Sequence, residues 1–233
     1  MRGPALDLKP KIRDRIAGRP AAVWTPADFL DLGARAAVDK ALQRLATGGD
    51  LRRIDRGLYD FPVINRLTQK PTPPATRAVI DAVARRDHAR LVVDGMTAAN
   101  DLGLTTAVPA QVTVLTDARL KPLQLGAQQI RFRQAAPSRL YWAGRPAMRV
   151  VQALHWLHDV LPSDRNVVLR QLRQIVDDPD QGAAIAEDLR QGLSAMPIWM
   201  QSIVRDLVAG ARHHGHEGGY GDAGDHHHLG ADR

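Results

Sequence analysis

The stretch from residue 25 to residue 61 constrains the fold more than any other part of the chain. It reads TPADFLDLGARAAVDKALQRLATGGDLRRIDRGLYDF. In order, it holds a capped short helix, a turn, a second helix, a Gly-Gly break and an arginine-rich hairpin that ends in an aromatic residue. This succession is typical of a winged helix-turn-helix, and it predicts such a unit at the amino end of the chain.

The short helix carries its own start and stop signals. Thr25 is the expected N-cap, with Pro26 in the first helical position and Asp28 completing a capping box. Gly33 is expected to adopt the left-handed conformation that turns the chain into the next helix.

The second helix is predicted over residues 34–46, ending at Gly48 and Gly49. A stripe at helical spacing predicts its buried face, formed by Val38, Ala41, Leu42 and Leu45. At 100° per residue, the opposite face holds Ala36, Lys40 and Gln43, with Asp39 and Arg44 beside it and Arg35 at its N-terminal edge. Glutamine reads adenine and lysine reads guanine in a major groove, so Lys40 and Gln43 are the candidate base contacts. The alternative is an ordinary amphipathic helix with solvated charges.

The segment after the Gly-Gly break is predicted to form two short strands around Arg56-Gly57. Its arginines are expected to hold phosphates, which position a protein on DNA without reading sequence. The complete set of expected DNA contacts is Arg35, Lys40, Gln43, Arg44, Arg52, Arg53 and Arg56.

The distribution of charge favours a nucleic-acid partner. Residues 1–70 carry a net charge of +6, whereas the whole chain carries +7. A basic excess confined to one region is the expected footprint of a DNA-binding domain. A general preference for arginine is the competing explanation, but it does not account for an excess at one end.

Composition excludes several classes of protein. The chain has 233 residues and no cysteine, which excludes disulfides and thiol chemistry. No apolar run is long enough to span a bilayer, and the N-terminal residues lack the apolar core of a signal peptide. We therefore expect a soluble cytoplasmic protein with no membrane contact, no cofactor and no specific metal site.

The fold class expected is α+β, with the winged unit followed by a small mixed α/β domain and C-terminal helices. Prolines at position 62 and in residues 70–74 indicate a linker. The domain boundaries predicted are 1–66, 75–160, 161–210 and a disordered His/Gly-rich tail over 211–233. The helices predicted are 6–17, 75–86, 95–104 and 197–209, and the strands predicted are 91–94, 111–117 and 128–133.

Signals for catalysis are weak. The chain has no GxxxxGK phosphate loop and no GxSxG elbow, and neither Glu187 nor Glu217 is followed two residues later by lysine. The run Asp177–Asp180 is interpreted as a loop in which Asp180 caps the next helix. His155 and His158 are interpreted as packing or surface residues. We therefore expect that the chain is not an enzyme.

Two segments resemble a known family. Residues 31–62 contain Ala41-Leu42, Arg44-Leu45, Gly49, Arg52-Arg53, Arg56-Gly57, Tyr59 and Pro62, and residues 97–117 read TAANDLGLTTAVPAQVTVLTD. They resemble the AbiEi-type antitoxins of type IV toxin–antitoxin systems. The resemblance implies a regulator that binds inverted repeats in double-stranded DNA at its own promoter. It also implies a nucleotidyltransferase-like toxin as a partner, although the helices beyond residue 160 do not match the family's pattern.

Two further functional classes stay open. The winged unit could bind a partner protein with no specific DNA recognition, its basic charge serving only solubility. A nuclease is a more distant third class.

Overall fold

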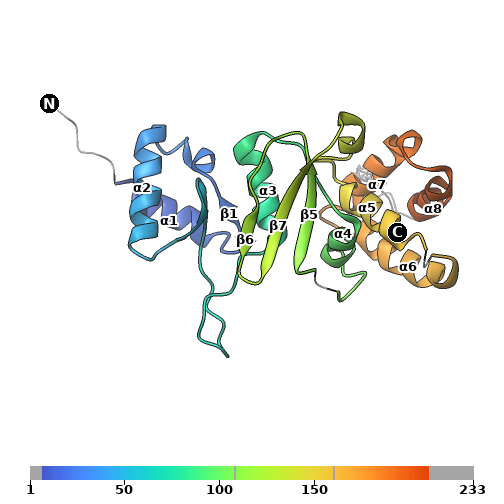
Figure 1. Cartoon of the computed structure of the whole chain (residues 1–233), viewed down its shortest axis with the longest axis horizontal. Coiled ribbons are helices and arrows are strands. Elements are labelled where there is room, and N and C mark those ends of the chain that lie inside the picture. Colours follow the sequence, from blue (N-terminus) through green and yellow to red (C-terminus); the bar gives the residue numbers. More distant parts are fainter. Residues whose placement is uncertain (1–6, 108, 160, 210–233) are drawn as a thin grey trace, which may run out of the picture.

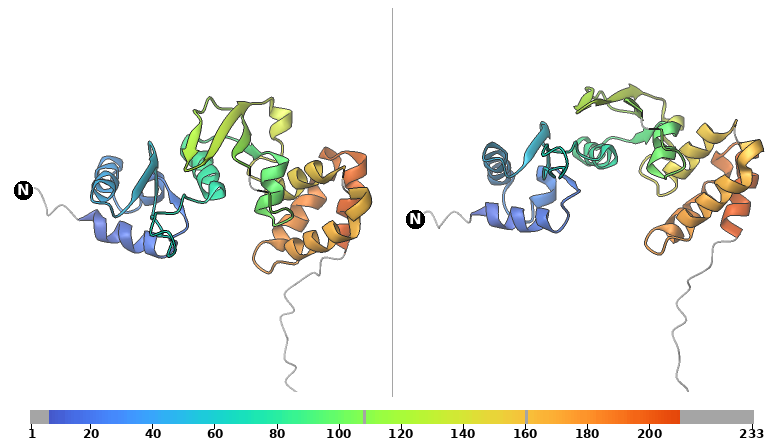
Figure 2. Two further views of the ribbon diagram at one scale, coloured as in Figure 1. Left: turned by 60° about the horizontal axis from the view of Figure 1, so that its bottom comes forward. Right: turned by 90° about the horizontal axis from the view of Figure 1, so that it is seen from below.

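The computed structural model describes residues 7–107, 109–159 and 161–209. Its parts follow one another along the longest axis, from the N-terminal helices through a central sheet to a group of C-terminal helices (Figure 1). Two further views show α3 (Thr76–Asp87) lying between the N-terminal part and the sheet (Figure 2). The mixed α+β class with C-terminal helices is thereby confirmed.

The N-terminal unit, residues 7–60, combines helices with a small antiparallel sheet. Its elements are α1 (Leu8–Ala17), β1 (Val23–Trp24), the 3-10 helix η1 (Pro26–Phe29), α2 (Arg35–Thr47), β2 (Arg52–Asp55) and β3 (Leu58–Asp60). The strands are ordered β1-β3-β2, with β3 paired to both neighbours. Apolar residues of α1, η1, α2 and the sheet form a core of their own, with Ile12, Phe29 and Leu42 completely buried.

Local capping explains where most of these helices begin and end. The predicted capping box is present, since the Asp28 carboxylate accepts hydrogen bonds from the backbone N–H and the hydroxyl of Thr25 at 2.7 and 3.0 Å. Gly48 caps α2 and Gly49 turns the chain at a φ of 82°, as expected. Asp7 caps α1, which therefore starts later than predicted; Leu6 lies outside the described residues.

The expected role of Gly33 is wrong. Gly33 is not among the glycines with positive φ. Instead, a Cβ at this position would lie 3.2 Å from the Leu8 side chain. A larger residue here would require the Leu8 side chain to shift, because α1 packs closely against the turn between η1 and α2.

The segment between the N-terminal unit and α3 is a projecting hairpin rather than a plain linker. Thr72 N–H donates to the Val63 carbonyl at 2.8 Å and Asn65 N–H donates to the Lys70 carbonyl at 2.9 Å, with a bridge between Ile64 and Pro71. It hangs away from the body of the molecule, in teal (Figure 1). We call residues 61–75 the arm.

The central part is a four-stranded sheet with helices packed on it. Its elements after α3 are β4 (Leu91–Val93), α4 (Gly95–Asp101), β5 (Gln111–Thr116), β6 (Leu123–Leu125), β7 (Gln128–Gln134) and the 3-10 helix η2 (Pro137–Leu140). The order is β4-β5-β7-β6, in which β5 and β7 run parallel and the outer pairs are antiparallel. The predicted strands are confirmed, whereas β6 and β1 were not predicted.

The C-terminal part consists of packed helices. They are α5 (Met148–Leu157), α6 (Leu161–Val176), α7 (Gly182–Gln191), the 3-10 helix η3 (Leu193–Ala195) and α8 (Ile198–Ala209). One apolar core runs from α3 and the sheet into these helices, so the boundary predicted at residue 160 separates helices that share a core. The predicted cap at Asp180 is wrong, because the Asp178 carboxylate accepts the backbone N–H groups of Asp180 and Gln181.

Candidate nucleic-acid interface

The outward face of α2 carries most of the residues expected to contact DNA. Val38, Ala41, Leu42 and Leu45 are buried, as the stripe predicted. Arg35, Lys40, Gln43 and Arg44 are exposed, whereas Ala46 is partly buried against the core. The core therefore fixes the rotation of α2, and this rotation presents the polar side chains away from the protein.

Three of these side chains are available for a ligand. Within the described residues, Lys40 and Arg44 have no ion pair and Gln43 has no hydrogen bond through its side chain. Arg35 differs, because its Nε lies 3.1 Å from the carboxylate of Asp39, one turn along α2. Both members of that pair are about half exposed or more, so the ion pair is weak and solvent-screened.

Arg52 does not fit its expected role as a phosphate contact. Its guanidinium donates to both carboxylate oxygens of Asp60 and to the Thr72 carbonyl at 2.8 Å. The Asp60 side chain is only 6% exposed. This arginine neutralises a buried carboxylate and ties the end of the arm to the β2–β3 hairpin, because the hairpin register places Arg52 opposite Asp60.

Arg53 and Arg56 remain exposed on the same hairpin. Arg53 makes only a long 3.4 Å hydrogen bond to the Asp55 carbonyl. Gly57 has a φ of 72°, which allows the tight turn predicted at this point. Neither Arg53 nor Arg56 forms an ion pair in the described part of the chain, so both guanidinium groups can contact an anionic partner.

The hairpin turn is held by α3, which sequence reasoning did not foresee. Arg86 donates to the Asp55 carboxylate at 2.9 Å and to the Arg56 carbonyl at 2.7 Å. Burial alone would raise the pKa of Asp55, but hydrogen bonds from Arg86 and from the Arg56 backbone outweigh it and hold the pKa below its ordinary value. A basic pair, Arg85-Arg86, at the end of a predicted helix was the only sequence signal for this contact.

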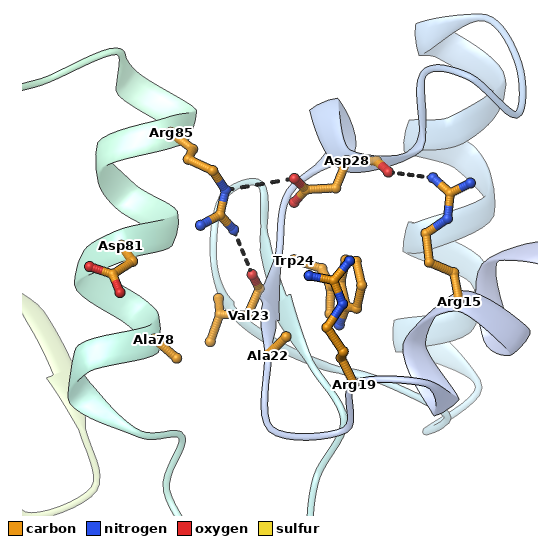
Figure 3. A pocket seen from close by; sticks show the side chains of 9 residues that line it. All are labelled: Arg15, Arg19, Ala22, Val23, Trp24, Asp28, Ala78, Asp81 and Arg85. Atoms are coloured by element: carbon orange, nitrogen blue, oxygen red, sulfur yellow. Dashed lines mark hydrogen bonds and ion pairs between the residues drawn. The ribbon is translucent and has the colours of Figure 1, made fainter. Parts of the chain in front are cut away.

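Arg85, next to Arg86 on α3, contacts β1 and η1 of the N-terminal unit (Figure 3). It donates to the Val23 carbonyl at 3.0 Å, and its Nε lies 3.6 Å from the Asp28 carboxylate. Across a cleft of about 550 Å³, Arg15 donates to the Asp28 carbonyl, and the Arg19 guanidinium lies 5.6 Å from the centre of the Trp24 ring. The contacts of Arg85 and Arg86 fix the N-terminal unit on α3.

The acids of the N-terminal unit determine which cations stay free. Arg13 pairs with Asp50, and Arg15 pairs with Asp31. The hydrogen bond from Arg15 lowers the pKa of Asp31. Lys40, Arg44 and Arg56 form no ion pair within the described residues, so α2 and the hairpin carry unpaired positive charge, as do Lys9 and Lys11 on α1.

Two features are absent from the described ranges, a cluster of metal-ligating side chains and a helix suited to crossing a membrane. These ranges contain no group of three or more His, Asp or Glu side chains placed to hold a metal ion. His155 and His158 instead flank Trp199, with ring centres 6.0 and 4.3 Å away, and both are exposed, which fits the prediction that they are packing or surface residues. The His-rich tail lies outside the described residues. None of the described helices combines the length and apolarity that crossing a bilayer requires.

Comparisons with known proteins give a family and no function. No curated protein matches the chain. The family model DUF6088, described as a family of unknown function, matches residues 11–176, which include α2, the arm and the sheet. Because that match spans well over half of the sequence, the chain belongs to the DUF6088 family.

Proposed function

We propose that the chain is a sequence-specific DNA-binding autoregulator whose N-terminal unit is a winged helix-turn-helix. The order helix, strand, helix, helix, strand, strand supports this, as does the sheet order β1-β3-β2. In such a unit the helix before the hairpin enters the major groove, and here that helix is α2.

The observation that carries the proposal is the outward face of α2. Lys40, Gln43 and Arg44 face solvent beside Ala36 and Ala37, whose small side chains let the helix approach a groove closely. Lys40 and Gln43 have the chemistry to read base edges, and Arg44 has the chemistry to hold a phosphate. Arg53 and Arg56 extend the basic surface to the hairpin.

Fluorescence anisotropy with DNA from immediately upstream of the coding region, against a scrambled duplex, tests the proposal. We expect tighter binding to the upstream duplex. Gln43→Ala should cost about 1–3 kcal/mol on that duplex and much less on the scrambled one. Gln174→Ala, which removes an exposed glutamine from α6, is the matched control and should change neither. Equal losses on both duplexes would remove the base-reading role of Gln43.

A salt series measures the phosphate contacts separately. Each phosphate contact adds about 0.9 to the slope of log affinity against log salt. The double variant Lys40→Ala, Arg44→Ala should therefore reduce the slope by about 0.9 for each side chain that contacts a phosphate. Arg170→Ala, Arg173→Ala removes the same charge from exposed positions of α6 and should leave the slope unchanged.

The finer part of the proposal is an antitoxin role. It is supported by the resemblance of residues 31–62 and 97–117 to AbiEi-type antitoxins, and the partner would be a nucleotidyltransferase-like toxin. Co-expression with the neighbouring gene should relieve growth arrest caused by that gene alone. A neighbour that arrests growth whether or not the chain is present would remove the antitoxin role and leave DNA binding intact.

The alternative is a protein-interaction module, in which the winged unit binds a partner protein and its basic charge serves only solubility. Arg86 already holds the backbone of the hairpin turn, so α2 would be the main contact with such a partner. Binding to DNA that is absent or independent of salt would favour this candidate. A plasmid-cleavage assay with divalent metal tests the remaining expectation, that the chain has no nuclease activity.

A further inference from the structure

The arm carries an unusual concentration of exposed apolar side chains. Phe61, Val63 and Ile64 are each about half exposed, and Leu67 at the tip is 95% exposed. Burial of such side chains is the main favourable term in protein association, so the row of apolar residues marks a contact surface.

Internal hydrogen bonds give the arm a defined shape. Besides the bonds between its two sides, the Asn65 carboxamide oxygen accepts the backbone N–H groups of Leu67 and Thr68 at 2.8 and 3.1 Å. Gln69, at a φ of 54°, donates its backbone N–H to the Asn65 carbonyl at 2.8 Å. The tip is therefore preorganised with Leu67 held outward, which lowers the entropic cost of binding.

An apolar groove lies at the base of the same arm. It has a volume of about 370 Å³, and its lining residues are Arg13, Ile16, Ala17, Pro20, Asp50, Leu51 and Phe61. Ile16 and Leu51 form a buried floor, while Phe61, the first residue of the arm, contributes a wall. The projecting leucine and the groove thus lie at opposite ends of one element, and Leu67 cannot fold back into its own groove.

We propose that two copies of this chain associate by exchanging arms, each placing Leu67 in the groove at the base of the other arm. Two arms laid antiparallel about a two-fold axis bring each tip to the partner's base, which is the self-complementary arrangement of an isologous dimer. The same contact between the two arms covers Val63 and Ile64, which lie between the tip and the base of each arm.

Charge and backbone chemistry favour the arm of a second copy of the chain as the occupant of the groove. Arg66 and Lys70 flank Leu67, and residues 61–75 contain no acid. The groove holds Asp50, which contacts Arg13 and is 40% exposed, so its carboxylate has capacity for a further cation. Prolines at positions 62, 71, 73 and 74 remove backbone N–H groups, so side chains rather than added strands must form the contact. Apolar wedges that enter DNA insert between base steps, which does not account for the apolar groove at the base of the arm.

Sedimentation velocity of the full chain without DNA tests the exchange, and it is independent of the proposed DNA binding. We expect a species of twice the 25.5 kDa chain mass that dissociates on dilution. Leu67→Asp should give a monomer, as should Ala17→Lys, which fills the groove with a charge that repels the cationic tip. Ile198→Asp changes an equally exposed apolar residue on α8 and should leave the dimer intact. Circular dichroism and thermal melting check that each variant is folded.

Mixing the two monomeric variants gives the sharpest result. A mixed pair retains one native arm in one native groove, so dimers should reappear in the mixture and in neither variant alone. A wild-type monomer at every concentration would overturn the proposal, as would a mixture that stays monomeric. Leu67→Asp that keeps the wild-type mass but loses affinity for DNA would also overturn it and assign the arm to DNA.

Discussion

The outward face of α2 and the residues around the start of α5 use arginine in opposite ways. In the C-terminal part, Arg149 is only 12% exposed and pairs with Asp101, while Arg145 pairs with the buried Asp188. On α2, Arg44 faces solvent, and the described residues place no acid against it. The position of the acids, rather than the number of arginines, therefore separates a structural cation from one that is free to bind a ligand.

The largest expected effect in this comparison concerns the buried Asp188, the partner of Arg145. Asp188 accepts hydrogen bonds from Arg145 and from the backbone N–H of Ala147, at 2.9 Å each for Arg145 Nε and the amide. Asp188→Asn leaves the partly buried guanidinium without its counter-charge, and we expect a loss of about 3 kcal/mol in the free energy of unfolding. Urea denaturation measures it.

The neighbouring Glu187 provides the control. It pairs with Arg190 at 3.2 Å in an exposed position, so Glu187→Gln should cost less than about 0.5 kcal/mol. Similar losses for the two variants would mean that burial does not separate the two kinds of pair.

The next test compares two adjacent arginines of β2. Arg52→Ala leaves the Asp60 carboxylate buried without a cation, and we expect a loss of about 2 kcal/mol in the free energy of unfolding. Arg53→Ala should cost less than about 0.5 kcal/mol. The effects on the salt slope of DNA binding should be reversed, with a reduction of about 0.9 for Arg53→Ala only. An Arg52→Ala variant that is as stable as the wild type but binds DNA weakly would show that Arg52 contacts DNA.

Sequence reasoning located α2 because two independent signals agreed. The apolar stripe of α2 gave its buried face, and the Gly-Gly break gave its end. The strands β1 and β6, of two and three residues, are too short to show a period and were missed, whereas the equally short β4 was predicted from its apolar run of Leu91, Val92 and Val93. Gly33 was misassigned because close packing and a left-handed turn both favour glycine, and only the position of Leu8 and the backbone φ decide between them.

The candidate site was less predictable, because exposure can be read from helical spacing and ion pairing cannot. The outward positions of Lys40 and Gln43 follow from the buried stripe alone. The Arg52–Asp60 pair follows only from the hairpin register, although the two residues do lie on either side of the Arg56-Gly57 turn. The contact of Arg86 with the turn joins residues thirty positions apart, and nothing local in the sequence encodes it.

Acid should weaken the contact between α3 and the hairpin turn. The pKa of Asp55 is held below its ordinary value, so the folded state favours the carboxylate. The resulting stabilisation is fully present above the ordinary carboxyl pKa of about 4 and is lost as the pH falls through the lower pKa of the folded state. Asp55 is 40% exposed, so we expect less than about 1 kcal/mol.

Urea denaturation of the wild type and Asp55→Asn across this pH range measures the effect. The difference between the two proteins should shrink as the pH falls. A difference that is constant with pH would mean that the Asp55 charge does not contribute to the contact.

The smallest expected effect concerns the one acid on the outward face of α2. Asp39 engages Arg35 and brings negative charge to the surface proposed to face phosphates. Asp39→Asn should therefore raise DNA affinity by less than about fivefold, equivalent to roughly 1 kcal/mol, and should increase the salt slope by up to about 0.9 if the released Arg35 reaches a phosphate. Asp206→Asn, which releases the exposed Arg165 on α6, is the matched control and should change neither quantity. Unchanged affinity for Asp39→Asn would place the start of α2 away from the DNA backbone and leave Lys40, Gln43 and Arg44 as the contacts on this helix.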